Sequence, residues 1–184
     1  MGAPEQRERY TSVPDPSPLH WRARVNAVDL AIYKRMRRLG HTSESVALVR
    51  EYSRLGEHGA IWLGAGLAGA IVDRPRRRNW LRATAAVGAA YATSTSIKLA
   101  VGRQRPAVED LPHLMATPTG LSFPSSHTTS SFAAARAFGV LVPGAPLQVA
   151  AAAMGLSRLY LGVHYPSDVA AGAALGLAIG SLGR

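Results

Sequence analysis

The chain has 184 residues, no cysteine and a formal net charge of +10; 47% of its residues are hydrophobic but only 7% are aromatic. The absence of cysteine excludes disulfide scaffolds, Cys-based zinc sites and thiol nucleophiles. Residues 59–184 hold eleven Lys/Arg against four Asp/Glu, and these charges interrupt long apolar runs. That pattern disfavours a nucleic-acid partner and is typical of a multi-pass cell-membrane protein with basic loops.

Three regions follow one another along the chain. Residues 1–20 contain four prolines and several charges, so we expect a disordered tail, and they lack the apolar core of a secretory signal. Residues 21–58 are expected to form amphipathic interfacial helices. Residues 59–184 carry the long apolar runs and are expected to form the membrane domain.

Two amphipathic helices are predicted before the apolar runs. Over residues 21–39 a broad apolar face adjoins a basic cluster around Lys34, which predicts a helix lying on an anionic membrane surface. A solvated surface helix explains the same pattern equally well. Thr42 or Ser43 can cap a second helix, which would run to about Leu55.

About five apolar helices are expected in the rest of the chain, so the predicted fold class is an all-α integral membrane helical bundle. The segment 60–72 is short of the roughly 20 residues that a perpendicular span requires, whereas 81–101 is long enough. Between them lies an arginine-rich loop, followed by Trp80 as a membrane-interface anchor. The remaining predicted apolar segments are 131–142, 146–156 and 168–182.

The last of these segments carries Gly172, Gly176 and Gly180 at four-residue spacing, which places three glycines on one helix face. Such a face allows two helices to approach closely within a membrane. We therefore expect this face to pack against another helix, and it offers a route to a homo-oligomer.

A first polar island ends the segment 81–101. A lysine such as Lys98, near the end of an apolar helix, is costly to bury without a partner or a function. Gly102 is a natural helix stop and Pro106 prevents continuation, so Arg105 can turn back toward Lys98. The alternative is a lysine that extends to the interface beside an ordinary basic loop.

A second island, Pro124-Ser125-Ser126-His127, opens an apolar helix. Backbone N–H groups and serine hydroxyls at a helix start form a cradle for an anion. His127 in the first turn could give a proton to a leaving group. The alternative is a capped helix with an interfacial histidine.

A third island contains Arg158, His164 and Asp168, with Pro166 suited to the first turn of the last helix. An aspartate beside a histidine fixes the tautomer of the ring, and an arginine offers a fixed positive charge to a phosphate. The alternative is a structural His–Asp pair with an arginine anchored at the lipid headgroups.

Each island lies at a helix end, and an up-and-down bundle brings alternate ends to one side, so we expect the three islands to meet. Together they supply the cations and hydrogen-bond donors that a phosphoryl-transfer transition state requires. No carboxylate cluster suited to magnesium is present, so we expect a mechanism without a metal or another cofactor.

The spacing Lys98-x6-Arg105-Pro106, then Pro124-Ser125-Ser126-His127, then Arg158-x5-His164-x3-Asp168 resembles the three-part signature of the type 2 phosphatidic acid phosphatase superfamily. The resemblance covers residues 98–168 in the family's order. One position departs from it: Ser126 stands where the family usually has glycine.

This resemblance implies a role for each residue. His164 would attack phosphorus and form a phosphohistidine, Asp168 would orient it, and His127 would protonate the leaving oxygen. The phosphoryl oxygens would be held by Lys98, Arg105, Ser125, Ser126 and Arg158.

The resemblance also implies a lipid phosphate as substrate, with membrane lipids as surroundings. Decaprenylphosphoryl-5-phosphoribose is the first candidate, and undecaprenyl pyrophosphate and phosphatidylglycerophosphate are alternatives. A vanadate haloperoxidase shares these motifs but is larger and soluble, and a membrane scaffold with an inactive site is the non-enzymatic alternative. The side of the membrane that the site faces stays open, since the Arg74–Arg78 loop and the basic N-terminus argue for opposite sides.

Overall fold

The computed structural model describes residues 18–184, with side chains from Val25 onward. Every regular element in this part of the chain is helical, and an isolated bridge between Gln104 and Leu121 is its sole extended pairing, which confirms the all-α class. The α-helices are α1 (Pro18–Arg37), α2 (Ser43–Leu55), α3 (Ala60–Val72), α4 (Arg77–Val101), α5 (Ser126–Phe138), α6 (Gly144–Tyr160) and α7 (Pro166–Gly180). The 3-10 turns are η1 (Glu57–Gly59), η2 (Arg74–Arg76) and η3 (Ser181–Gly183).

The predicted disordered tail lies outside the described residues up to position 17. Helix α1 begins at Pro18, within the last three positions of that segment. Proline is well suited to the first turn of a helix, where its missing N–H group would have no partner.

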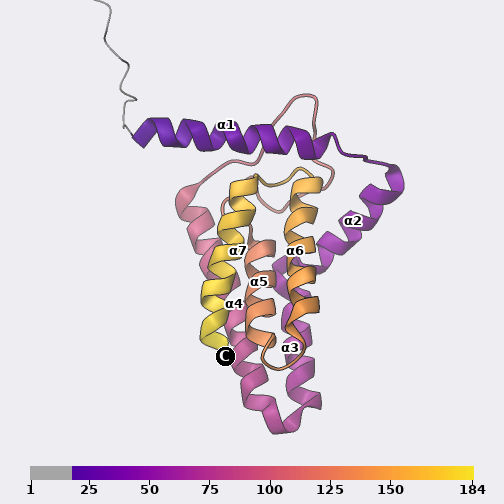
Figure 1. The fold of residues 1–184 in the computed structure, drawn as a ribbon, viewed down its shortest axis with the longest axis vertical. Helices are drawn as coiled ribbons and strands as arrows, with labels where there is room; N and C mark the ends of the chain where they lie inside the picture. Colours follow the sequence, from indigo (N-terminus) through magenta and orange to yellow (C-terminus); the bar gives the residue numbers. More distant parts are fainter. Residues whose placement is uncertain (1–17) are drawn as a thin grey trace, which may run out of the picture.

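Helices α4 to α7 run side by side along the long axis, and α5 packs against α4, α6 and α7 (Figure 1). Helix α1 lies across one end of this bundle, and α2 leads obliquely from α1 toward α3 (Figure 1). The end of the bundle beneath α1 is where α6 finishes and α7 begins (Figure 1). This up-and-down arrangement is the one that the sequence argument required.

The glycine face of α7 packs against α5 within the same chain. A Cβ atom on Gly172 would lie 2.7 Å from the Ser125 carbonyl oxygen, and one on Gly180 would lie 2.6 Å from that of Ala133. At Gly176 it would overlap the Thr129 carbonyl oxygen. The predicted close helix approach is therefore present, and the helix that occupies this face is α5 of the same chain.

We expect Gly176→Ala to destabilise the protein, because its methyl group would force α5 and α7 apart; overpacking of this kind typically costs about 1–3 kcal/mol. The free energy of unfolding, or the apparent unfolding temperature in detergent, measures the effect. Gly64→Ala in α3 is the matched control, since no atom lies within 4 Å of a Cβ built there. Equal stability of the two variants would contradict the close α5–α7 packing.

Trp80 is part of the core, so its prediction as an interface anchor is wrong. Its side chain is 8% exposed, its ring centroid lies 5.4 Å from that of Phe138, and its indole N–H donates to Asp73 Oδ2 at 3.0 Å. The residue sits inside α4 because that helix begins at Arg77 and not at position 81.

Helix α1 contacts the bundle through a polar stripe. Asp29, Tyr33 and Arg37, spaced four residues apart, are buried, whereas Val28 and Ile32 are 57% and 43% exposed. The Arg37 guanidinium donates to the carbonyl oxygens of Tyr160 and Pro112 at 3.2 and 2.6 Å. The helix is thus held by hydrogen bonds on one face and leaves apolar side chains uncovered on another.

Among the described helices, none by itself has both the length and the apolar composition of a membrane span, contrary to the expectation for residues 81–101. Helix α2 together with the segment Glu57–Val72 meets both criteria as a pair bent by 44°.

Candidate active site

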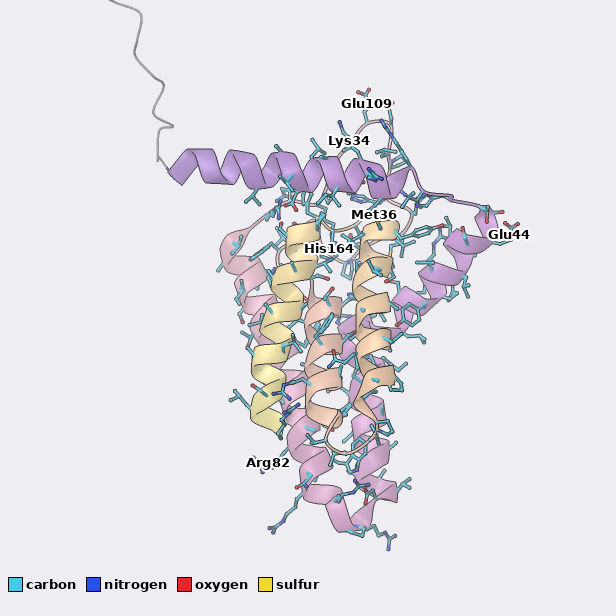
Figure 2. All side chains as sticks on the ribbon, viewed as in Figure 1. Lys34, Met36, Glu44, Arg82, Glu109 and His164 are labelled. Atoms are coloured by element: carbon cyan, nitrogen blue, oxygen red, sulfur yellow. The ribbon has the colours of Figure 1, made fainter. Side chains whose placement is uncertain are left out.

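The three polar islands meet in a cavity of about 170 Å³ at the end of the bundle beneath α1. Figure 2 shows His164 at this end and Arg82 near the opposite one. Six of the eight predicted site residues line the cavity: Lys98, Arg105, Ser126, His127, Arg158 and His164. The other two, Ser125 and Asp168, lie behind this lining, where each is fully buried.

Lys98 and Arg105 converge as the sequence argument expected. Gly102 ends α4 in the left-handed conformation with φ 67°, and its N–H group donates to the Lys98 carbonyl at 3.0 Å. The Lys98 ammonium is buried and donates to the carbonyl oxygens of Ser122 and Pro124 at 3.0 and 2.7 Å. These two acceptors leave part of its donor capacity for a ligand, because an ammonium has three N–H groups.

Arg105 is fixed by the loops around it. Its Nε donates to the Thr119 carbonyl at 2.9 Å, and its Nη1 donates to the Val163 carbonyl at 2.6 Å. Burial lowers the pKa of Arg105 to about 10, with the Asp168 carboxylate acting in the opposite direction. The guanidinium therefore keeps its charge at neutral pH.

His164 presents one ring nitrogen to the cavity and the other to an aspartate. Its Nδ1 lies 3.4 Å from Asp168 Oδ2, whereas its Nε2 lies 3.2 Å from Arg105 Nη1 on the cavity side. Burial, reinforced by the charges of Arg158, Arg105 and Lys98, holds the pKa of His164 well below its usual value of 6.5. The ring is therefore neutral at neutral pH, and a proton on Nδ1 leaves Nε2 unprotonated, with a lone pair that accepts from Arg105 Nη1 in this structure and can attack an electrophile.

Asp168 is fixed by two further donors. Its Oδ2 accepts from the backbone N–H of Tyr165 at 2.8 Å, which forms part of the N-terminal cap of α7. Its Oδ1 accepts from Arg103 Nη1 at 2.8 Å. The carboxylate behind His164 is thus tied to the start of α7 and to the loop after α4.

Arg103 connects the site to α1, and the sequence argument missed this connection. The other end of its guanidinium donates to Asp29 Oδ2 at 2.7 Å, and the group lies 4.2 Å above the Tyr165 ring centroid. Asp29 Oδ1 also accepts from the backbone N–H of Ser167 at 2.9 Å. Asp29 is the single acidic residue in the basic sequence of α1 and lies four residues before Tyr33. This isolated acid was the signal in the sequence that could have revealed the connection.

The second island forms the start of α5. Ser125 is the N-cap, and its hydroxyl oxygen accepts from the backbone N–H and hydroxyl of Thr128 at 3.5 and 2.9 Å. Ser126, at the position where the family usually has glycine, accepts from the Ser94 hydroxyl at 2.6 Å and lines the cavity. His127 follows in the first turn and also lines it.

Arg158 is 2% exposed and faces the cavity from the last turn of α6. Its Nη1 donates to the hydroxyl of Ser53, which comes from α2, and lies 3.1 Å from the sulfur of Met115. Residues outside the three islands, on α2 and in the 102–125 loop, therefore help to position this cation.

The sequence profile of the PAP2 superfamily matches residues 79–183, more than half of the chain. This chain belongs to the PAP2 superfamily. Decaprenylphosphoryl-5-phosphoribose phosphatase of Mycobacterium tuberculosis H37Rv is 47% identical to it over 138 residues, which cover 74% of this chain and 77% of that one.

Two solved structures share the PAP2 fold of this chain. The Aquifex aeolicus LpxE structure has a TM-score of 0.73 at 24% identity and covers 85% of this chain and 94% of that one. A transmembrane PAP2-type phosphatidylglycerolphosphate phosphatase from Bacillus subtilis also has a TM-score of 0.73 at 24% identity, covering 87% and 84%. The family resemblance found in the sequence is confirmed, and the PAP2 protein described here is a membrane lipid phosphatase, a phosphoric monoester hydrolase.

Proposed function

We propose that this PAP2 phosphatase removes the terminal phosphate of decaprenylphosphoryl-5-phosphoribose at the membrane surface. The observation that supports this lipid is the 47% identity to the mycobacterial enzyme named for it, over three quarters of both chains. The geometry supports the chemistry, because His164 Nε2 faces a cavity lined by Lys98, Arg105 and Arg158.

The proposed reaction has two steps. His164 Nε2 attacks phosphorus in line and the bond from phosphorus to the ribose oxygen breaks, while His127 gives that oxygen a proton. Water, losing a proton to His127, then attacks the phosphohistidine, which releases phosphate and restores both histidines. The lysine and the two arginines stabilise the charge on the phosphoryl oxygens in both transition states.

The remaining predicted residues have supporting roles. Asp168 keeps the proton of His164 on Nδ1 and stabilises the positive charge that the ring gains when Nε2 bonds to phosphorus. Ser126 lines the cavity, and its hydroxyl and backbone N–H groups would donate hydrogen bonds to the phosphoryl oxygens. Ser125 contributes as the N-cap that positions the first turn of α5, with its N–H donating to the Asp168 carbonyl at 3.0 Å.

We further propose that the protein is a multi-pass protein of the cell membrane, with residues 59–184 as its membrane domain and residues 21–58 at the interface. The outer surface of the bundle supports this, because large apolar side chains such as Ile71 and Val149 are 71% and 70% exposed. The interior is comparatively polar, since Thr129 and Ser131 in α5 are fully buried. Exposed apolar surface of this extent is typical of contact with lipid.

Phosphate release from a panel of lipids tests the proposed function. The panel contains decaprenylphosphoryl-5-phosphoribose, undecaprenyl pyrophosphate, phosphatidylglycerophosphate and phosphatidic acid, each with and without EDTA. We expect the fastest release from the first lipid and no loss on chelation, because the proposed steps use only protein side chains and water. Loss of activity with EDTA would contradict the metal-free mechanism, and release from none of the lipids would favour the inactive scaffold.

A further inference from the structure

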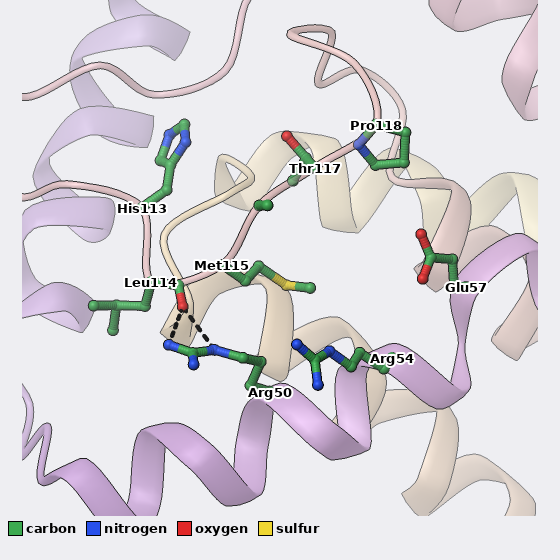
Figure 3. Close-up of a pocket in the computed structure, with 9 residues that line it drawn as sticks. Arg50, Arg54, Glu57, His113, Leu114, Met115, Thr117 and Pro118 are labelled. Carbon is green, nitrogen blue, oxygen red and sulfur yellow. Dashed lines mark hydrogen bonds between the residues drawn. The ribbon is translucent and has the colours of Figure 1, made fainter.

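A larger cavity adjoins the catalytic one. It measures about 810 Å³ and lies between α2 and the loop at residues 113–118 (Figure 3). Glu57 and Pro118 line both cavities and thus form the border between them. The wall on the α2 side carries Arg50 and Arg54, which lie one helical turn apart and therefore on the same face.

Arg50 is positioned in advance of any ligand. Its Nε and Nη2 both donate to the Leu114 carbonyl, at 3.0 and 2.7 Å, which anchors the guanidinium to the opposite wall (Figure 3). Its Nη1 makes no hydrogen bond with any described side chain or backbone group, so three of the five guanidinium N–H groups remain for a ligand.

The Arg54 guanidinium is also available to bind a ligand. Its Nη1 contacts Glu51 at 2.5 Å, but the two side chains are 56% and 64% exposed, and an ion pair in such contact with water is weak. Glu51 does not line the cavity, so Glu57 at the border is the one carboxylate among the described lining residues. The wall on the α2 side is therefore cationic.

We propose that this cavity is a second-anion subsite, in which Arg50 and Arg54 bind a phosphodiester of the substrate that is not hydrolysed. The inference rests on the proposed function, since decaprenylphosphoryl-5-phosphoribose carries such a phosphodiester on the far side of its ribose. Because the 170 Å³ catalytic cavity shares Glu57 and Pro118 with the 810 Å³ cavity, a substrate whose terminal phosphate lies in the first can place its sugar at the border and its second phosphate in the second.

Glu57 completes the subsite at that border. A carboxylate accepts hydrogen bonds from sugar hydroxyls and repels phosphate, so it favours ribose between the cavities and leaves the phosphodiester to the arginines. Helix α2 and Glu57 lie outside residues 79–183, which the PAP2 profile matches. The subsite thus selects the substrate, while the matched region performs the chemistry that the family has in common.

The experiment compares Arg54→Gln with wild type on two lipids, decaprenylphosphoryl-5-phosphoribose and phosphatidic acid, which has no second phosphate. We expect kcat/KM for the first lipid to fall about tenfold more than that for the second, as expected for one lost charge-assisted hydrogen bond. Arg54→Lys should recover part of the preference. Arg78→Gln, an exposed arginine at the other end of the bundle, is the matched control and should leave the preference as it is.

A binding measurement separates the subsite from catalysis. Decaprenylphosphoryl-ribose, the dephosphorylated lipid, is titrated into His164→Ala protein with and without Arg54→Gln, and we expect about tenfold weaker binding in the double variant. Equal losses on both lipids, or unchanged affinity for decaprenylphosphoryl-ribose, would overturn the subsite. If the wild type releases no phosphate from decaprenylphosphoryl-5-phosphoribose, the proposed function fails, and this titration still decides whether the cavity binds a phosphodiester.

Discussion

Replacing His164 with alanine is expected to reduce phosphate release by more than about 1,000-fold, as is usual when an enzyme loses its nucleophile. The reason is geometric: in the described structure Nε2 of this ring faces the cavity, where Arg105, Lys98 and Arg158 would hold the phosphoryl group. A radiolabelled substrate should leave an acid-labile phosphohistidine on the wild type and none on the variant.

A folding control is needed because His164 is 1% exposed and its loss leaves a cavity. The apparent unfolding temperature of His164→Ala and His164→Gln should show that both variants still fold. His41→Ala removes a histidine that stacks on Tyr160 outside the catalytic cavity and should keep its activity. Full turnover by a folded His164 variant would show that another group attacks phosphorus.

Arg103→Gln should lower kcat about 100-fold with a smaller change in KM, because a displaced catalytic group is costly even when the substrate still binds. Arg103 does not line the cavity; it acts through Asp168, whose Oδ1 it contacts at 2.8 Å. The same change leaves the buried carboxylates of Asp168 and Asp29 without a cation, so we also expect a loss of about 3–5 kcal/mol in stability.

Asp29→Asn distinguishes positioning from folding alone. It removes the ion pair between Arg103 and α1 but leaves the Arg103–Asp168 pair, so kcat should fall less than in Arg103→Gln. Arg103→Lys, which retains the charge, should recover part of the lost kcat. Steady-state kinetics on protein that has passed a thermal unfolding control provides the measurement. A rise in KM alone would place Arg103 in substrate binding instead.

Local patterns in the sequence were sufficient to predict most helices, but several of their ends differ: the helix expected at 131–142 runs from Ser126 to Phe138, and the one expected at 146–156 runs from Gly144 to Tyr160. Pro166, Gly102 and Thr42 mark helix boundaries because each has a backbone or side-chain property that a helix end requires, and the structure places each at such an end. Gly172, Gly176 and Gly180 indicated a close helix contact because spacing alone places them on one face. The identity of the partner helix could not be read from spacing, and α5 of the same chain holds that position.

The three islands around Lys98, His127 and His164 were identified from the sequence because charged and polar residues at the ends of apolar helices are costly without a function. The spacing of their residues also indicated the family to which the chain belongs, and the comparison with known proteins confirmed it. The sequence by itself therefore determined which chemical groups are available for a site and in what order they follow one another along the chain. The chemistry of phosphoryl transfer followed from that inventory of groups.

Only the tertiary structure decided how the islands are supported. Asp29 and Arg103 lie 74 residues apart, and Ser53 and Arg158 lie 105 apart, so neither contact leaves a local signal in the sequence. The cavity beside Arg50 likewise exists only because α2 leans toward the 113–118 loop. His164, Arg158 and Asp168 could be named from the sequence, but their partners depend on long-range packing, which determines what each charged group contacts.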